Sequence, residues 1–406
     1  MVNVSSSNGL EKRPRLAFRN TDGSHFPCWR QTSLGCIIEP YSEKVYGEHD
    51  YEVLTSSREG LQRQEDHFGS KQRHDTDGYN IIPFGYCTYR NRSDDGKFAF
   101  NINTISEKAI VSKFYPVFRF TNANSTFMAE FLNSSPCVKK KLSVLAVGTS
   151  QVVLSFEALK AAKFDLPCKD EQDKIAAFLE CLNTRIENQR TLVVALKKYK
   201  RGVVRTLLSP KHCKLKNVEW TTAKIGDIGT FIKGAPLSKA DISSDGTPFI
   251  LYGELYTTYN EVISKVVRKT QASVDKQYYS QIGDVIIPTS GETPEEISTA
   301  SCVMLPDIIL AGDLNIYRCT QVDGRIMSYI LNHVVNDRIA RVAQGKSIVH
   351  VQATEISKIE ITYPDLISQK KLIETFDAIT ARIDQSMREL ELLQVHRKAL
   401  LQQLFI

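Results

Sequence analysis

The sequence lacks the closely spaced cysteines that hold a disulfide framework or a zinc site. Its nine cysteines are scattered, and no two of them form a C-x-x-C pair. Because both kinds of site require paired, close spacings, we expect reduced thiols that serve as small apolar side chains. The cysteines are Cys28, Cys36, Cys87, Cys137, Cys168, Cys181, Cys213, Cys302 and Cys319.

Long apolar runs are also missing. Residues 1–10 are polar and rich in Ser and Asn, and the longest apolar runs, such as 144–147, are far shorter than a membrane span. We therefore expect a cytoplasmic protein that does not enter a membrane. The formal net charge of +6 over 406 residues favours an anionic partner, but only weakly.

The motifs of several enzyme classes are absent or broken. No Pro-Pro dipeptide occurs, which excludes the (N/D)-P-P-(Y/F) loop of amino-methyltransferases, and no G-x-G-x-x-G loop occurs. Gly345-Lys346-Ser347 resembles the end of a P-loop, but Ala340 occupies the position of its first glycine. We therefore expect no catalytic, cofactor-binding or metal-binding residue in this chain.

What the sequence does contain is an internal repeat. Residues 142–208 align with residues 339–405 at a constant shift of 197 and without a gap, and 117–119 align with 316–318 at a shift of 199. Each unit reads as a globular domain followed by a long helix. The expected segments are a mobile basic arm (1–22, with Lys12, Arg13, Arg15 and Arg19), a first domain (23–165), a first helix (166–212), a second domain (213–363) and a second helix (364–406).

Both long helices carry apolar residues at alternating spacings of four and three. Eight of ten seam positions are apolar in each helix, and the polar exceptions fall at the same two places, Gln189 and Lys200 in one and Ser386 and Arg397 in the other. Such a stripe is typical of a coiled coil. The predicted seam includes Ile175, Leu179, Leu182, Ile186, Val193 and Leu196 in the first helix, and Leu372, Phe376, Ile379, Ile383, Leu390 and Leu393 in the second.

Pairing the two helices with each other satisfies both seams, and the pseudo-twofold symmetry of a duplicated chain makes the pair antiparallel. The alternative is that each helix packs only on its own domain. The rise from residue 175 to residue 207 is about 48 Å, the length of about 14 base pairs of B-DNA. The helix pair could therefore serve as a ruler.

Each globular domain is predicted to be α+β and largely β. Short runs rich in Ile, Val, Tyr and Phe are bounded by Gly, Asn, Asp or Pro, as strands are. Helices are expected over 127–132 and 326–342. The predicted strands lie within residues 78–89, 109–120, 150–156, 285–288 and 359–363.

Four segments carry a resemblance to a known family. Residues 166–209 open on Leu-Pro, continue with Glu-Gln and run into a heptad helix with a basic end, and 369–405 are a more divergent copy in which Ser368 stands in place of Glu171. Together with GDVIIPTSG (283–291) and the run 343–364, they resemble the specificity subunits of type I restriction-modification enzymes.

The resemblance implies a non-catalytic subunit with two target recognition domains, each binding one half of a bipartite double-stranded DNA target. It further implies that two methyltransferase subunits dock on the helix pair and that restriction (translocase) subunits join through them. The chain itself would carry no cofactor, whereas S-adenosylmethionine, ATP and Mg²⁺ would belong to the partners. A DNA reader of a related phage-defence system and a protein-binding coiled-coil scaffold stay open as alternatives.

DNA-contacting residues are expected where Arg, Asn, Lys and small hydroxyl side chains gather in loops. Arginine reads guanine edges, asparagine reads adenine, and lysine mostly neutralises phosphates; solvated loops are the simpler interpretation of such clusters. In the first domain the candidates are Arg58, Arg63, Lys71, Arg73, His74, Tyr89, Arg90, Asn91, Arg92, Lys97, Thr149 and Ser150. In the second they are Lys233, Lys239, Thr289, Ser290, Glu292, Lys346 and Ser347. For Arg119 and Arg318, a structural salt bridge is expected at least as much as a contact with DNA.

Overall fold

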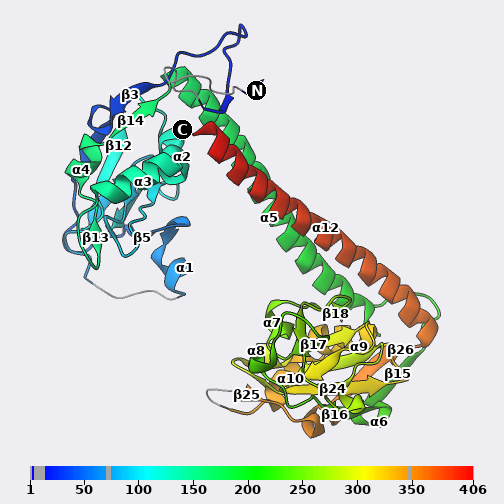
Figure 1. Ribbon diagram of the computed structural model, residues 1–406. Helices are drawn as coiled ribbons and strands as arrows, with labels where there is room; N and C mark the ends of the chain where they lie inside the picture. Colours follow the sequence, from blue (N-terminus) through cyan, green and yellow to red (C-terminus); the bar gives the residue numbers. More distant parts are fainter. Residues whose placement is uncertain (1, 4–13, 70–74, 346–348, 406) are drawn as a thin grey trace. The chain divides into compact units, whose positions relative to one another are not determined.

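The computed structural model describes residues 2–3, 14–69, 75–345 and 349–405, and it divides into two compact units (Figure 1). One unit comprises residues 1–190 and 389–406, and the other comprises residues 191–388. Each unit contains one α+β domain together with segments of both long helices, so the expected fold class is confirmed.

The domain of the first unit is built on two small sheets with helices packed on one of them. One sheet has the spatial order β10 (Phe100–Ile102), β8 (Cys87–Tyr89), β12 (Val117–Phe120), β4 (Ile38–Tyr41). The other has the order β6 (Gly60–Arg63), β5 (Glu52–Ser57), β11 (Lys108–Val111), β7 (Asn80–Pro83). Two-stranded pairs add β1 (Val2–Asn3) with β2 (Leu16–Ala17), β3 (Arg30–Ser33) with β14 (Lys163–Leu166), and β9 (Arg92–Ser93) with β13 (Val152–Val153). The helices are α1 (Gln64–Phe68), α2 (Ser125–Ser134), α3 (Pro136–Leu145) and α4 (Phe156–Ala161).

The domain of the second unit repeats this plan with a larger sheet. Its five strands have the order β16 (Gly229–Lys233), β24 (Leu314–Cys319), β20 (Asp284–Pro288), β22 (Ser301–Val303), β18 (Val262–Ile263). A three-stranded sheet follows the order β19 (Arg268–Thr270), β17 (Thr247–Leu251), β23 (Ile309–Ala311), and the pairs are β15 (Trp220–Lys224) with β26 (Glu360–Pro364) and β21 (Ser290–Gly291) with β25 (Val349–His350). The helices are α6 (Ile225–Ile228), α7 (Glu254–Thr257), α8 (Pro294–Ile297), α9 (Gly324–His333), α10 (Asn336–Val342) and α11 (Ala353–Ser357).

Strand β20 shows why these residues form a sheet. All five of its residues are buried, and the apolar run 285–288 is as expected of a central strand. Helix α9 covers β20 and β22, and Asp323 caps it by accepting a hydrogen bond from the backbone N–H of Arg325. Asn124 caps α2 in the same way through Phe127. A cap of this kind stabilises a helix by about 1 kcal/mol.

A pair of side-chain hydrogen bonds within the first domain has a counterpart within the second domain, as the internal repeat predicts. The side chain of Asn133 bonds the backbone N–H and C=O of Phe100 at 2.8 and 2.7 Å. Asn332, 199 residues later, bonds both groups of Ala300 at 3.1 and 2.6 Å. The expected duplication is therefore present in three dimensions.

The two long helices, α5 (Lys169–Leu207) and α12 (Leu366–Leu404), pair in antiparallel fashion. In the first unit Arg397 donates to Asn183 at 2.6 Å, and Gln189 donates to Glu389 at 3.4 Å. Residue numbers therefore rise along α5 in the direction in which they fall along α12. Among the predicted seam residues, Leu182, Leu196, Ile379 and Leu390 are half-buried and the other eight are buried. No helix among the described residues is long and apolar enough to cross a membrane.

Equivalent glutamines fasten the beginning of each long helix to its domain. Gln172 accepts a hydrogen bond from Asn124 N at 2.9 Å and donates to Pro167 O at 3.0 Å. Gln369 accepts from Asp323 N at 2.7 Å and donates to Pro364 O at 2.8 Å. Both side chains are buried, so each bond satisfies a backbone group that water cannot reach.

Each domain core also contains residues from both long helices. In the first unit Leu179 of α5 and Leu404 of α12 belong to the cluster around Phe127. In the second, Val204 of α5 and Phe376 of α12 belong to the cluster around Tyr329. Every domain is thus packed on the beginning of its own helix and on the end of the helix from the other repeat.

Part of the expected N-terminal arm is packed on the first unit, against helix α5. Lys12 and Arg13 lie outside the described residues. Ala17 is buried, and the ring of Phe18 lies edge-on to that of Phe178, with ring centroids 5.7 Å apart. Arg19 donates to Gly23 O at 2.8 Å.

Candidate nucleic-acid interface

The strand pairing places the predicted clusters of the two domains at equivalent positions. In the first domain Arg92 of β9 is paired with Val153, and in the second Ser290 of β21 is paired with His350. The adjoining backbone bonds also match: Leu154 N donates to Asn91 O at 2.9 Å, and Val351 N donates to Thr289 O at 3.0 Å. The segment 90–92 therefore corresponds to 288–290.

Two separate candidate loops of the first domain meet in one recess. Arg58 follows strand β5, whereas Arg90, Arg92 and Lys97 follow β8, yet all four side chains line a cavity of about 110 Å³. We refer to it below as the basic recess. Four cations around so small a volume favour an anionic or acceptor-rich ligand.

The charges of the basic recess are only partly balanced within the domain. Asp95 pairs with Arg58 at 2.5 Å and with Lys97 at 3.3 Å. Desolvation opposes ionisation of Asp95, but hydrogen bonds from Ser93 and the backbone N–H of Lys97 together outweigh it and lower its pKa to about 2. The carboxylate therefore stays charged and holds both cations in place.

Arg90 and Arg92 pair with no carboxylate among the described residues, and both are exposed. The guanidinium carbon of Arg92 lies 5.1 Å from the centre of the Phe114 ring, a cation–π contact that orients the group without consuming its donors. These two arginines are the best-placed candidates of the first domain for phosphate or guanine contacts.

Other candidates of the first domain have structural partners. Tyr89 is completely buried and donates to Leu154 O at 3.0 Å, so the structure places it in the core rather than at a surface. Burial raises its pKa far above the ordinary value. Arg63 pairs with Glu52 at 3.0 Å on the surface. Asn91 is half-buried, and its Oδ1 has no partner among the described residues.

The loop after α3 is a tight hairpin that exposes Thr149 and Ser150. It closes through reciprocal bonds between Val147 and Val153, at 3.0 and 2.9 Å, and it turns at Gly148, whose φ is +144°. The second domain repeats the hairpin between Gln344 and His350, with Gly345 at φ +141°. Lys71, Arg73, His74, Lys346 and Ser347 lie outside the described residues.

The second domain holds a larger cavity, of about 890 Å³, at the equivalent end of its sheet. Lys233 at the end of β16 and Thr289 after β20 both line it, so two predicted residues meet there. Ser290 does not join them, because it is buried and donates to Asp313 at 2.8 Å. Lys239 and Glu292 are exposed and do not line the cavity.

Arg119 and Arg318, which correspond in the repeat, both form ion pairs with strand residues. Arg119 contacts Glu39 at 2.7 Å on the surface. Arg318 contacts Asp284, a buried carboxylate, at 3.0 Å. Their structural role agrees with the salt bridges expected at these positions.

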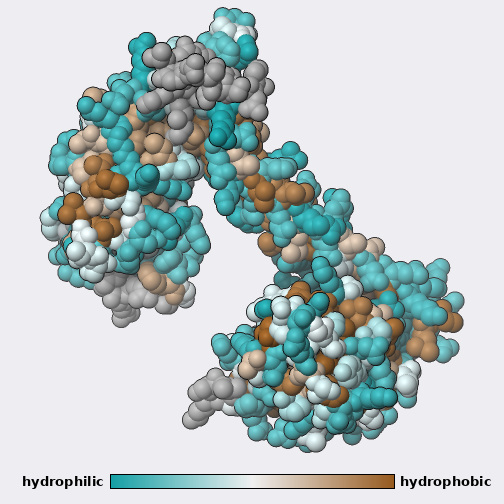
Figure 2. Space-filling model, in the orientation of Figure 1, coloured by the Kyte–Doolittle hydropathy of each residue, from teal (hydrophilic) through white to brown (hydrophobic). Residues whose placement is uncertain are grey.

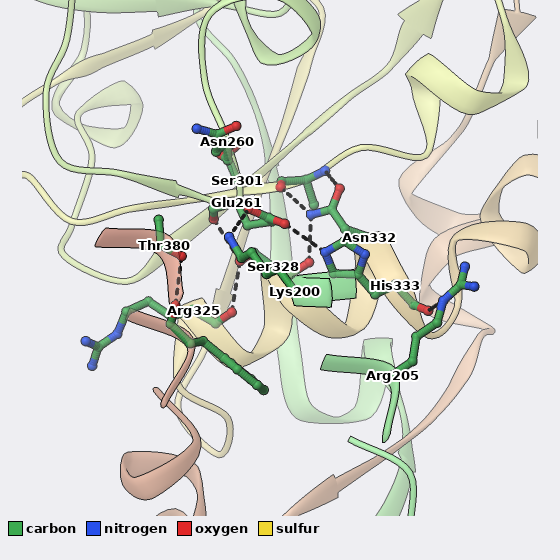
Figure 3. A network of polar contacts seen from close by, with 12 residues as sticks. Lys200, Arg205, Asn260, Glu261, Ser301, Arg325, Ser328, Asn332, His333 and Thr380 are labelled. Carbon is green, nitrogen blue, oxygen red and sulfur yellow. Dashed lines mark hydrogen bonds and ion pairs between the residues drawn. The ribbon is translucent and has the colours of Figure 1, made fainter. Parts of the chain in front are cut away.

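Sequence reasoning missed a polar network in the second unit (Figure 3). Lys200 leaves the seam of α5 and donates to Glu261 at 2.9 Å, and His333 donates to the same carboxylate at 2.7 Å. Since an ionised carboxylate can only accept, the His333 Nε2 atom carries the proton. Burial opposes ionisation, but the His333 hydrogen bond and the Lys200 charge lower the pKa of Glu261 to about 2.

The comparisons with known proteins agree with this architecture. The family model for the type I restriction modification DNA specificity domain matches the chain twice, over residues 39–196 and 217–394. No curated protein matches the chain significantly. A type I restriction-modification S subunit from M. genitalium has a similar fold, with 15% identity, 97% of this chain and 99% of that chain covered, and a TM-score of 0.56.

A second solved structure, from work on complex assembly and conformational transition of the type I R-M system, is similar to the same extent. Its identity is 15%, 93% of this chain and 97% of that chain are covered, and its TM-score is 0.58. At such identity the solved structures establish the fold, whereas the family models establish membership. The chain belongs to the family of type I restriction-modification DNA specificity proteins.

Proposed function

We propose that this chain recognises a bipartite DNA target, with each recognition domain binding one half. The observation that carries the proposal is that two copies of one specificity domain present different side chains at equivalent loops. Arg90 and Arg92 of the first copy are replaced by Pro288 and Ser290 in the second. One scaffold with two different surfaces suits a target whose halves differ in sequence.

The paired helices would space the two halves and dock the methyltransferase subunits. Docking of this kind needs exposed apolar side chains, and Figure 2 shows such side chains at the surface of the helix pair. In the first unit they include Leu392 and Val395, which are 57% and 62% exposed, and in the second they include Val194 and Tyr199, at 61% and 60%. Exposed apolar side chains on a helix favour a protein partner.

Chemistry would remain with those partners. We propose that S-adenosylmethionine is bound by the methyltransferase subunits, and ATP and Mg²⁺ by the restriction subunits that join through them. Within the described residues, no group of three or more His, Cys, Asp or Glu side chains is arranged to hold a metal ion. The expected role of this chain is recognition without catalysis.

The test is the double substitution Arg90→Ala with Arg92→Ala in the complex of the chain with its partner subunits. Sequencing methylated sites in a host that carries the complete system identifies both halves of the target. The double variant is expected to relax one half, or to weaken binding with a flatter salt dependence, and to leave the other half intact. Arg119→Ala, which removes an exposed but ion-paired arginine of the same domain, is the control. Unchanged recognition of both halves would contradict the assignment.

A wild-type complex that binds no duplex at any salt concentration would instead favour a scaffold that binds only protein. Phosphate neutralisation gives a steep dependence of affinity on salt, which protein docking need not show.

A further inference from the structure

The cavity of the second domain has an unsatisfied hydrogen-bond donor in its wall. Asn315 of β24 lines the cavity and is only 2% exposed. Its Nδ2 atom is buried, and no described residue accepts a hydrogen bond from it. An unpaired buried amide costs on the order of 1–3 kcal/mol, so a ligand that brings an acceptor to this position would recover that cost.

The neighbours of Asn315 define what kind of acceptor fits. Lys233 is its cross-strand partner in β16, and the two side chains lie on one face of the sheet because directly paired residues do so. The apolar part of the lining includes Phe231 and Leu237, and the polar part also includes His350 and Gln352. A planar, partly apolar group with a hydrogen-bond acceptor matches this lining. The cavity volume of about 890 Å³ lies within the range of small-molecule sites.

The bases of an intact duplex lie inside its grooves, which are themselves concave. Only two groups of DNA could therefore enter a concave site on the protein. They are a base turned out of the stack and a backbone phosphate. The carboxyl group of Asp313 also lines the cavity and accepts from Ser290. A carboxylate disfavours a second anion, which argues for the base.

The internal repeat points the same way. The alignment at a shift of 199 places Pro116 where Asn315 stands. Extending the pair Val117–Tyr41 by one residue brings Ser42 to the position that Lys233 occupies opposite Asn315. His350 likewise corresponds to Val153. The shared framework is thus kept while the cavity lining differs. Phosphates are the same at every target, so a lining that differs between the halves suits the reading of bases.

We propose that one nucleotide of the second half-site turns its base into this cavity and that Asn315 donates a hydrogen bond to an acceptor on that base. Asn315 is then a specificity-determining residue of the second domain, and Lys233 helps to hold the same nucleotide. The proposal rests on the function proposed above, and it names the site and the chemistry by which one half of the target is read.

The test measures how each base of the second half-site couples to Asn315. The complete complex is titrated with its target duplex and with duplexes that carry one changed base pair at a time. For the wild type, the change at the base read by Asn315 is expected to weaken binding about tenfold or more. For Asn315→Leu that one penalty is expected to fall close to unity, while the penalties in the first half-site stay as they were.

Three further measurements keep the result decisive. Asn315→Asp retains the size of the side chain but replaces the N–H donor, so it serves if the leucine variant folds poorly. A duplex with an abasic sugar at the same position keeps its phosphate and should bind the wild type and Asn315→Leu equally. Asn332→Asp alters an amide whose two N–H groups are already bonded to Ala300 O and Ser328 O; it should lower stability without changing any base penalty.

The inference is overturned if every base penalty survives in both Asn315 variants. It is also overturned if both variants weaken all duplexes equally, because an equal loss would indicate a contact to a backbone phosphate, which every duplex carries. A wild-type complex that shows no base penalties anywhere would instead reject the proposed DNA recognition, so the two failures are distinguishable.

Discussion

Lys200 and Arg397 occupy the same place in the two repeats, 197 residues apart, and each leaves the helical seam to contact an acid of a recognition domain. In the second unit Lys200 meets Glu261 at 2.9 Å. In the first unit Arg397 meets Glu130, and it also donates to Asn183 of α5. Each domain therefore receives a cation from the end of the long helix that belongs to the other repeat.

Substitution Lys200→Met should destabilise the second unit. Lys200 is 7% exposed, and its loss leaves the Glu261 carboxylate largely buried with only His333 as a neighbouring donor. Breaking a buried pair on one side costs about 3–5 kcal/mol. Unfolding of the chain followed by hydrogen exchange in residues 191–388 would measure the effect. Lys198→Met, on the exposed face of the same helix, should change stability by less than about 0.5 kcal/mol. Equal effects of the two substitutions would contradict the assigned pair.

The same carboxylate predicts a dependence of stability on pH. Because the pKa of Glu261 is lowered from 4.5 to about 2 in the folded chain, the folded state binds its proton less readily than the unfolded state. The contribution is then fully present above about pH 4.5 and is lost as the pH falls toward 2. At 1.36 kcal/mol for each unit it is on the order of 3 kcal/mol. The unfolding free energy of the wild type minus that of Glu261→Gln, followed from pH 7 to pH 2, should fall through this window. A difference that stays constant would refute the prediction.

The heptad spacing was sufficient to predict paired antiparallel helices, because a stripe of period 3.5 needs a partner and a duplicated chain supplies one. The breaks in the stripe at Lys200 and Arg397 were visible in the sequence, but their acids were not. Glu261 lies 61 residues from Lys200 in the chain and carries no local signal. Long-range pairs of this kind depend on how the domain packs on the helices.

Gly148→Ala should disturb the hairpin that presents Thr149 and Ser150. At φ +144° an alanine is strained, and its Cβ would lie 2.3 Å from Gln151 O. The expected cost is about 1–3 kcal/mol, seen as faster hydrogen exchange at the amides of Val147 and Val153. Gly47→Ala is the matched control, since that glycine has φ +72° and nothing within 4 Å of the added Cβ. Its local exchange should change less, and unchanged exchange in the Gly148 variant would count against the hairpin geometry.

The candidate interface was only partly accessible to sequence reasoning. The polar candidates around β8 include Arg90 and Arg92, which line the basic recess, but they also include Tyr89, which is buried. Composition cannot distinguish these residues, because Tyr89 is the last residue of β8 and its side chain enters the core. Asn315 was missed for the converse reason. It lies within an apolar strand, and only the strand register shows that its amide faces the same side as Lys233.

Replacing both Leu392 and Val395 by glutamate should weaken assembly with the methyltransferase subunit. The two side chains are three residues apart, which places them on one face of α12, and both are more than half exposed, so the change should leave the fold intact. If the proposed docking is correct, burying two carboxylates at the interface should raise the Kd at least tenfold. Co-purification and titration with the partner subunit would measure it. Gln394→Glu, an exposed polar position between them, adds the same kind of charge on a neighbouring face and should assemble as the wild type does. Wild-type affinity in the double variant would place the docking surface elsewhere on the chain.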